Sequence, residues 1–257
     1  MPPAQRQGAI LDFTNRTVVV TGAGAGIGRA YAEAFAERGA AVAVVDIDEA
    51  RAHETASALT ATGAAAIGLG ADVASEDATR EALSQIVHQF GHLDVVVNNA
   101  GLHLGIYNET TELPVEDWRR LLDVNLLGAM LWSKHARPHL AGGEGAILNQ
   151  SSNSSTMGVG AYSVSKLALN GLTASLAREF ADDGIRVNAI APGFVASDAA
   201  RDGLSESHKA LVMQGQITKR QGQPRDLVDT VLFLCSEKAA FVNGQTWFVD
   251  GGWQVRL

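Results

Sequence analysis

The stretch that decides the fold is Thr17-Val18-Val19-Val20-Thr21-Gly22-Ala23-Gly24-Ala25-Gly26-Ile27-Gly28, an apolar segment that runs directly into a glycine-rich turn. A helical pattern follows at once over Ile27 to Arg38. Glycine lets the backbone turn sharply and approach a ligand closely, and a helix start presents free N–H groups to an anion. The strict G-x-G-x-x-G spacing is absent, so the prediction depends on the order of strand, turn and helix. That order predicts a loop that binds the pyrophosphate of a dinucleotide.

The rest of the chain repeats this alternation of short apolar runs and helical segments. The runs are rich in Val and Ile and lack polar alternation, which is typical of strands buried on both faces. Such an order predicts an α/β fold of the Rossmann type, a doubly wound parallel sheet of about seven strands with helices on both faces. The expected strands are Thr17–Val20, Ala41–Val45, Ala65–Leu69, Leu93–Val97, Ala146–Leu148, Ile185–Ile190 and Thr246–Val249. The expected helices are Ile27–Arg38, Glu76–Phe90, Trp118–Leu140 and Ala161–Phe180.

No linker divides the chain, so we expect a single domain over residues 1–257. One long irregular segment, Phe194 to Pro224, follows an expected strand at the edge where open α/β sheets bind ligands. Connections of this length are uncommon in compact domains and are usually functional. We therefore expect a substrate lid within about 194–224, with an ordinary surface helix and loop as the alternative.

Composition and charge restrict the partners. The chain has 20 Lys and Arg against 28 Asp and Glu, a formal net charge of −8. Because phosphate contacts need clustered cations, we expect neither nucleic acid nor an anionic membrane surface as a partner.

Cys235 is the only cysteine and the pair His135 and His139 lacks a third ligand, so no metal site is expected. Without a visible secretory signal or spanning segment, the expected location is cytoplasmic.

Asp46 closes the second apolar run. A carboxylate there can accept hydrogen bonds from both hydroxyls of an adenosine ribose, and it would repel a 2′-phosphate. No Arg or Lys occurs within the glycine turn to bind such a phosphate. NAD is therefore the expected cofactor rather than NADP. The alternative is that Asp46 caps the next helix, a role that Asp48 could also serve.

Tyr162 and Lys166 stand four residues apart in a helical segment, so they share a face. An ammonium close to a tyrosine stabilises the phenolate, which lowers the pKa of the hydroxyl and permits proton exchange nearer neutral pH. The pair therefore predicts a general acid/base.

Taken together, these motifs resemble the classical short-chain dehydrogenase/reductase family from about Asp12 to Trp253. The matching motifs are Thr21–Gly28, Asp72-Val73, Asn98-Asn99-Ala100-Gly101, Asn125 in Asp-Val-Asn-Leu, Ser151-Ser152, Tyr162 with Lys166, Pro192-Gly193, Gly244-Gln245-Thr246 and Asp250-Gly251-Gly252. Several independent motifs in the right order make chance agreement a poor explanation.

The resemblance implies a role for each matched position. Tyr162 would be the general acid/base, Lys166 would bind the nicotinamide ribose and tune the tyrosine, and Asn125 would hold a water of a proton relay. Ser152 would donate a hydrogen bond to the substrate oxygen, where negative charge develops. The implied cofactor contacts are Gly22, Gly26, Ile27 and Gly28 at the pyrophosphate, Asp46 at the ribose, Asp72 and Val73 at the adenine, Asn98, Ala100 and Gly101 along the nucleotide, and Pro192, Gly193, Val195 and Ser197 at the nicotinamide.

One departure from the family pattern concerns the serine. Ser152 lies three residues closer to Tyr162 than the family's serine lies to its tyrosine. We attribute this to a shorter loop within Asn153–Gly160 that leaves Ser152 at the strand end. The alternative is that Ser154 or Ser155 is the donor.

The implied function is an NAD-dependent oxidoreductase that interconverts a secondary alcohol and a ketone by hydride transfer. The implied assembly is a homo-oligomer, a dimer of dimers through Trp118–Leu140 and Ala161–Phe180, with burial of these helices inside one subunit as the alternative. A non-catalytic nucleotide-binding or scaffold protein of the same fold is the competing hypothesis, and a cofactor-free lyase or dehalogenase is a third. The intact set Asn125, Ser152, Tyr162 and Lys166 favours catalysis. His103 is either a substrate contact or an exposed loop residue.

Overall fold

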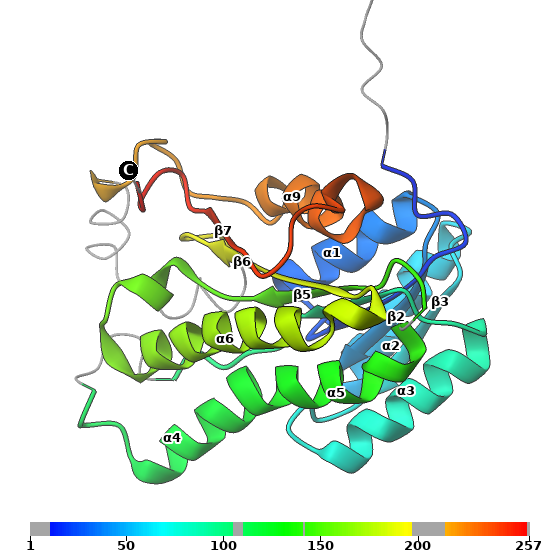
Figure 1. Cartoon of the computed structure of the whole chain (residues 1–257), viewed down its shortest axis with the longest axis horizontal. Coiled ribbons are helices and arrows are strands. Elements are labelled where there is room, and N and C mark those ends of the chain that lie inside the picture. The colour runs from blue at the N-terminus through cyan, green and yellow to red at the C-terminus, as the bar shows by residue number, and fades with distance from the viewer. Residues whose placement is uncertain (1–10, 105–109, 141, 197–213, 256–257) are drawn as a thin grey trace, which may run out of the picture.

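Seven parallel strands form one sheet in the order β3-β2-β1-β4-β5-β6-β7 (Figure 1). The computed structural model describes residues 11–104, 110–140, 142–196 and 214–255. The strands are β1 (Thr17–Thr21), β2 (Ala41–Asp46), β3 (Ala66–Gly70), β4 (Val95–Asn98), β5 (Ala146–Gln150), β6 (Arg186–Pro192) and β7 (Thr246–Val249). All seven expected strands and the doubly wound parallel sheet are confirmed. The strand order reverses between β1 and β4, and α/β sheets bind ligands at that switch point.

Helices cover both faces of the sheet, with α1 and α9 above it and α3, α5 and α6 below it in Figure 1. Val18 and Val20 of β1 pack into one apolar core and Val19 into the other, because successive strand residues point to opposite faces. The first core contains residues of α1 (Gly26–Glu37), α2 (Glu49–Ala61) and α9 (Arg225–Cys235). The second contains residues of α3 (Glu76–Phe90), α5 (Ala129–Leu140) and α6 (Gly160–Glu179).

Two helices were not among those expected from the sequence. The α2 segment is rich in alanine and polar residues, so its apolar periodicity is weak. Its start is nevertheless marked by Asp48, whose carboxylate accepts a hydrogen bond from the Arg51 N–H at 3.2 Å. The second such helix, α9, follows the long irregular segment and buries Leu227, Val231 and Leu232.

The expected continuous helix Trp118–Leu140 is interrupted. The structure has α4 (Val115–Leu122), then a π-helical turn over Asp123–Gly128, and then α5. A π turn admits one extra residue per turn, and such turns are frequent at functional sites. Asn125 lies inside this turn, which the apolar pattern did not predict.

The lid expected within about 194–224 is described only at its two ends. Val195 and Gly222 form a parallel bridge, in which the Gly222 N–H donates to Phe194 O at 3.1 Å and the Ala196 N–H donates to Gly222 O at 2.9 Å. The middle of the segment, residues 197–213, lies outside the described residues, and so does Ser197. Among the helices in the described ranges, none combines the length and apolarity needed to span a bilayer.

Candidate active site

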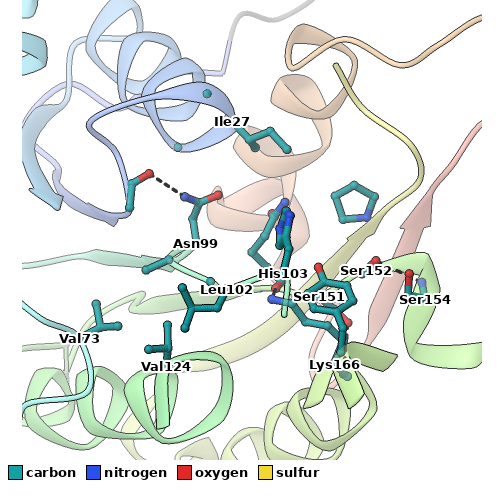
Figure 2. A pocket seen from close by; sticks show the side chains of 18 of the residues that line it. Ile27, Val73, Asn99, Leu102, His103, Val124, Ser151, Ser152, Ser154 and Lys166 are labelled. Atoms are coloured by element: carbon teal, nitrogen blue, oxygen red, sulfur yellow. Dashed lines mark hydrogen bonds between the residues drawn. The ribbon is translucent and has the colours of Figure 1, made fainter. Parts of the chain in front are cut away.

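A cleft opens at the carboxyl ends of the strands, where the glycine turn, the residues after β4 and the start of α6 meet. In Figure 2, Val73, Asn99, Leu102 and Val124 lie towards one end, whereas His103, Ser151, Ser152 and Lys166 gather towards the other. Most of the predicted cofactor positions line this cleft, namely Gly22, Gly26, Ile27, Gly28, Asp46, Asp72, Val73, Ala100, Gly101, Pro192, Gly193 and Val195.

The glycine turn is shaped so that side chains would not fit. Gly22 and Gly26 have φ values of 62° and 58°, in the left-handed region that favours glycine. A Cβ at Gly28 would lie 2.3 Å from Gly22 O and 2.4 Å from Asn99 Nδ2. Asn99 fixes the turn by donating from Nδ2 to Thr21 O at 2.9 Å and to Gly22 O at 3.0 Å. The result is an open backbone cradle at the start of α1.

Asn98, which the resemblance places along the nucleotide, has its side chain below the cleft rather than in the cleft lining. Asn98 is buried, and its Nδ2 donates to Asn149 Oδ1 at 2.9 Å and lies 3.3 Å from Ser133 Oγ, beneath the cleft. The next residue, Asn99, lines the cleft instead. Strand alternation explains the difference, because Asn98 points to the same face as Val96, towards α5.

Asp46 faces the cleft from the end of β2. Its Oδ2 accepts a hydrogen bond from the Gly24 N–H at 2.9 Å, and its Oδ1 accepts one from the Asp48 N–H at 3.0 Å. The cap of α2 is Asp48, so the capping alternative for Asp46 is excluded. Arg51 lines the same end of the cleft and pairs with Asp48, with 3.2 Å between Nε and Oδ2.

Tyr162 and Lys166 lie on the first two turns of α6, and both are buried. The Lys166 Nζ is 5.7 Å from the centre of the Tyr162 ring and donates a hydrogen bond to Gln150 O at 2.7 Å. Burial disfavours the ammonium and lowers the pKa of Lys166 to about 8. The helix therefore holds a cation beside the tyrosine within the cleft.

Ser152 lies just after β5 and lines the cleft. Its Oγ accepts a hydrogen bond from the Ser154 N–H at 3.1 Å, and its own hydroxyl is 3.5 Å from Asn153 Oδ1. A hydroxyl donor normally lies 2.5–3.0 Å from its acceptor, so this proton is only weakly held. Ser155, in contrast, is buried and accepts a hydrogen bond from Asn170 Nδ2 at 3.0 Å.

Asn125 sits beneath the floor of the cleft. Its Oδ1 accepts from the Leu102 N–H at 2.7 Å, and its Nδ2 donates to Leu102 O and to Ser165 Oγ, each at 3.0 Å. A Cβ at Gly101 would lie 3.3 Å from both Asn125 Oδ1 and Lys166 Nζ. The absence of a side chain at Gly101 thus leaves space between the amide and the ammonium.

Several residues line the cleft without having been predicted as site residues, among them Asn99, Val124 and Trp253. The Asp250 carboxylate accepts hydrogen bonds from the N–H groups of Gly252, Trp253 and Gln254 at 2.8–3.2 Å, which sets Trp253 in the wall. His103, left open by the sequence, also lines the cleft. Its ring packs edge-on against Tyr162, with 5.2 Å between ring centres and 71° between planes.

Comparison with known proteins gives the family. A family profile described as "Enoyl-(Acyl carrier protein) reductase" matches residues 22–254. The chain is 37% identical to "Glucose 1-dehydrogenase 2" of Bacillus subtilis (strain 168) over 204 residues, 77% of this chain and 79% of that protein. It belongs to the short-chain dehydrogenase/reductase family.

Other members of this family are also similar to this protein over most of its length. The chain is 39% identical to "3-oxoacyl-(acyl-carrier-protein) reductase FabG" of Staphylococcus aureus (strain Mu50) over 194 residues, 74% of this chain and 78% of that protein. A solved 7 alpha-hydroxysteroid dehydrogenase, complexed with NADH and 7-oxo glycochenodeoxycholic acid, superposes with a TM-score of 0.90 at 31% identity, covering 94% of this chain and 95% of that one. The protein is therefore an oxidoreductase of the short-chain dehydrogenase/reductase family.

Proposed function

We propose that this protein is an NAD-dependent oxidoreductase that interconverts a secondary alcohol and a ketone. The observation that carries the proposal is the position of Tyr162, with the Lys166 ammonium 5.7 Å from its ring, in the same cleft as the glycine cradle. A protein that only bound a nucleotide would have no need to bury an ammonium beside a tyrosine, because burial of a charge is costly.

The cleft fits a dinucleotide at its cradle end. Gly22 lets the turn pack against the Ala100 backbone, and Gly28 lets α1 begin against Gly22 O. We place the pyrophosphate at this turn, at the N-terminus of α1. Two backbone N–H groups fix the Asp46 carboxylate beside Gly24, where it can accept the ribose hydroxyl protons. This carboxylate supports NAD over NADP. The solved hydroxysteroid dehydrogenase is described with NADH, which agrees with the proposal.

The bound nicotinamide supplies the acceptor or donor of hydride; the protein supplies position and proton transfer. In alcohol oxidation, Tyr162 Oη takes the hydroxyl proton while Ser152 Oγ–H donates to the same substrate oxygen. The Ser152 proton is only weakly held by Asn153, 3.5 Å away, whereas the Ser155 hydroxyl is buried against Asn170, and this difference supports Ser152 rather than Ser155 as donor. In ketone reduction, the same groups act in reverse.

Asn125 and Lys166 support a route for that proton. The space at Gly101, 3.3 Å from Asn125 Oδ1 and Lys166 Nζ, is where we place a water that links Tyr162 to solvent. Asn125 also positions the loop, because its amide binds both polar atoms of the Leu102 backbone.

We also propose that the subunits form a homo-oligomer, a dimer of dimers. Leu127 of the π turn and Val164 and Leu167 of α6 are large apolar residues that stay exposed, at 44%, 43% and 56%. Neighbouring exposed apolar side chains on adjacent helices favour burial against a second copy.

The test of the proposed function is a panel of secondary alcohols with NAD, followed by NADH absorbance. Time-dependent NADH formation with at least one alcohol is expected. Tight NADH binding without turnover of any alcohol or ketone would favour the scaffold hypothesis instead.

A further inference from the structure

His103 lines the cleft beside Tyr162, at the end where Ser152 and Lys166 gather in Figure 2. It follows β4, and its neighbours Leu102 and Leu104 both pack on the apolar cluster of Leu113, Leu121, Ala161 and Tyr162. Asn125 fixes the Leu102 backbone on both sides through two hydrogen bonds. Because both neighbours are anchored, the position of the His103 ring against the cleft is defined by the fold.

The ring of His103 is a close neighbour of the Tyr162 ring, which carries the hydroxyl that we assign to proton exchange. Its centre is 5.2 Å from the centre of the Tyr162 ring, in an edge-to-face arrangement. A substrate oxygen bound to Tyr162 Oη lies at hydrogen-bond distance, roughly 2.7 Å. Because His103 and Tyr162 line the same cleft, we place the carbon next to the reacting carbon on the side of Tyr162 that His103 occupies.

The imidazole also has the right chemistry for an uncharged partner. Although the residue as a whole is exposed, desolvation of the ring within the cleft and the nearby Lys166 ammonium both lower the pKa of His103. The ring is therefore neutral near neutral pH, with one N–H donor and one nitrogen acceptor. Such a ring suits a hydroxyl, which can both donate and accept, better than it suits a carboxylate.

We propose that His103 is a specificity-determining residue that binds a hydroxyl on the carbon next to the reacting carbon, so that the substrates are vicinal diols and their hydroxy ketones. This inference rests on the proposed function. During oxidation, the reacting C–H gives its hydride to oxidised nicotinamide, and the O–H on the same carbon gives its proton to Tyr162. A C=O bond forms there, and the second hydroxyl stays bound to His103 unchanged.

The experiment compares two matched pairs of substrates, 2,3-butanediol with 2-butanol and cis-1,2-cyclohexanediol with cyclohexanol. The measured quantity is the ratio of kcat/KM for the diol to that for the monoalcohol. The wild-type ratio should exceed one, and His103→Leu should lower it by about tenfold, mainly through KM, on the scale of one hydrogen bond. His103→Gln keeps hydrogen-bonding groups and should restore most of the ratio. His88→Leu, the same change at an exposed position of α3, is the matched control and should leave the ratio unaltered.

The outcomes separate this inference from the proposed function. A wild-type ratio of one or less, or an equal loss on both members of a pair in His103→Leu, overturns the inference and leaves the function standing. Turnover of other secondary alcohols without turnover of either diol also overturns the inference and leaves the proposed function standing. If no secondary alcohol reacts at all, the proposed function itself fails. Unfolding temperature and NADH binding of each variant show whether a loss comes from misfolding.

Discussion

The Asn125 side chain binds the Leu102 backbone through both of its polar atoms, accepting from N–H at 2.7 Å and donating to C=O at 3.0 Å. This pairing joins the π turn to the loop after β4, which carries His103 to the side of Tyr162. The two hydrogen bonds of this amide link the irregular π turn to the irregular loop.

Asn125→Ala should therefore affect stability as well as turnover. It leaves the N–H and C=O of Leu102 without their partners, which costs about 1–3 kcal/mol when such groups are buried. Chemical denaturation should show this loss in the free energy of unfolding, and kcat should fall as well. Asn125→Asp keeps the acceptor and loses the donor, so its free energy of unfolding should lie between those of the wild type and Asn125→Ala. Wild-type stability in Asn125→Ala would show that the pairing is not structural.

Asp46 should set the choice of cofactor. The wild-type kcat/KM with NAD should exceed that with NADP by more than roughly tenfold, because a fixed carboxylate favours ribose hydroxyls and repels a 2′-phosphate. Asp46→Ala should narrow this difference in kcat/KM, because it removes the carboxylate that repels a 2′-phosphate at the end of the cleft that Arg51 also lines. Equal use of both cofactors by the wild-type protein would contradict this role.

Ser152 should be the serine that matters for the chemical step. Ser152→Ala should lower the rate by roughly 10²–10³-fold, the scale for losing one donor to a developing oxyanion. Ser154→Ala should be mild, because the contact that Ser154 makes with Ser152 comes from its backbone N–H. Ser155→Ala should act mainly on stability, since its hydroxyl binds Asn170. Single-turnover rates on all three variants test this, and a larger loss at Ser154 or Ser155 would move the donor into the loop.

Lys166 should lower stability in a pH-dependent way. Its pKa is about 8 in the folded protein against 10.5 ordinarily, so folding is penalised wherever the lysine is charged. The cost is complete below pH 8 and disappears as the pH rises towards 10.5. Lys166→Met should thus be more stable than wild type at neutral pH by about 2 kcal/mol, allowing for the lost hydrogen bond to Gln150. Denaturation measured from neutral to alkaline pH should show the free energies of unfolding of the two proteins converging. A Lys166→Met variant that is less stable than the wild type at neutral pH would refute this.

The sequence predicts the sheet well because its strands are buried on both faces and therefore read as continuous apolar runs. The π turn carries no such signal, since Asp123–Gly128 keeps a helical apolar pattern while the backbone widens. The α2 helix is missed because tertiary packing, rather than an apolar stripe, secures it.

Among the site residues, the glycine turn and Asp46 follow from residue type and order. The burial of the Asn98 side chain could have been predicted by continuing the alternation of Val95, Val96 and Val97, which places Asn98 on the α5 face. No local pattern could place Trp253, because a distant segment brings it to the cleft. His103 follows β4 directly, and the structure adds that its ring lies against Tyr162.

The most direct test of the central claim is the rate of NADH formation by Tyr162→Phe, with its NADH affinity measured in parallel by fluorescence titration. The substitution keeps the buried ring and removes only the hydroxyl that we assign to proton exchange. Turnover should fall by at least roughly 10²-fold, as expected for loss of a general acid/base, while NADH affinity stays near the wild-type value. Substantial turnover by Tyr162→Phe would show that another group exchanges the proton and would contradict the account.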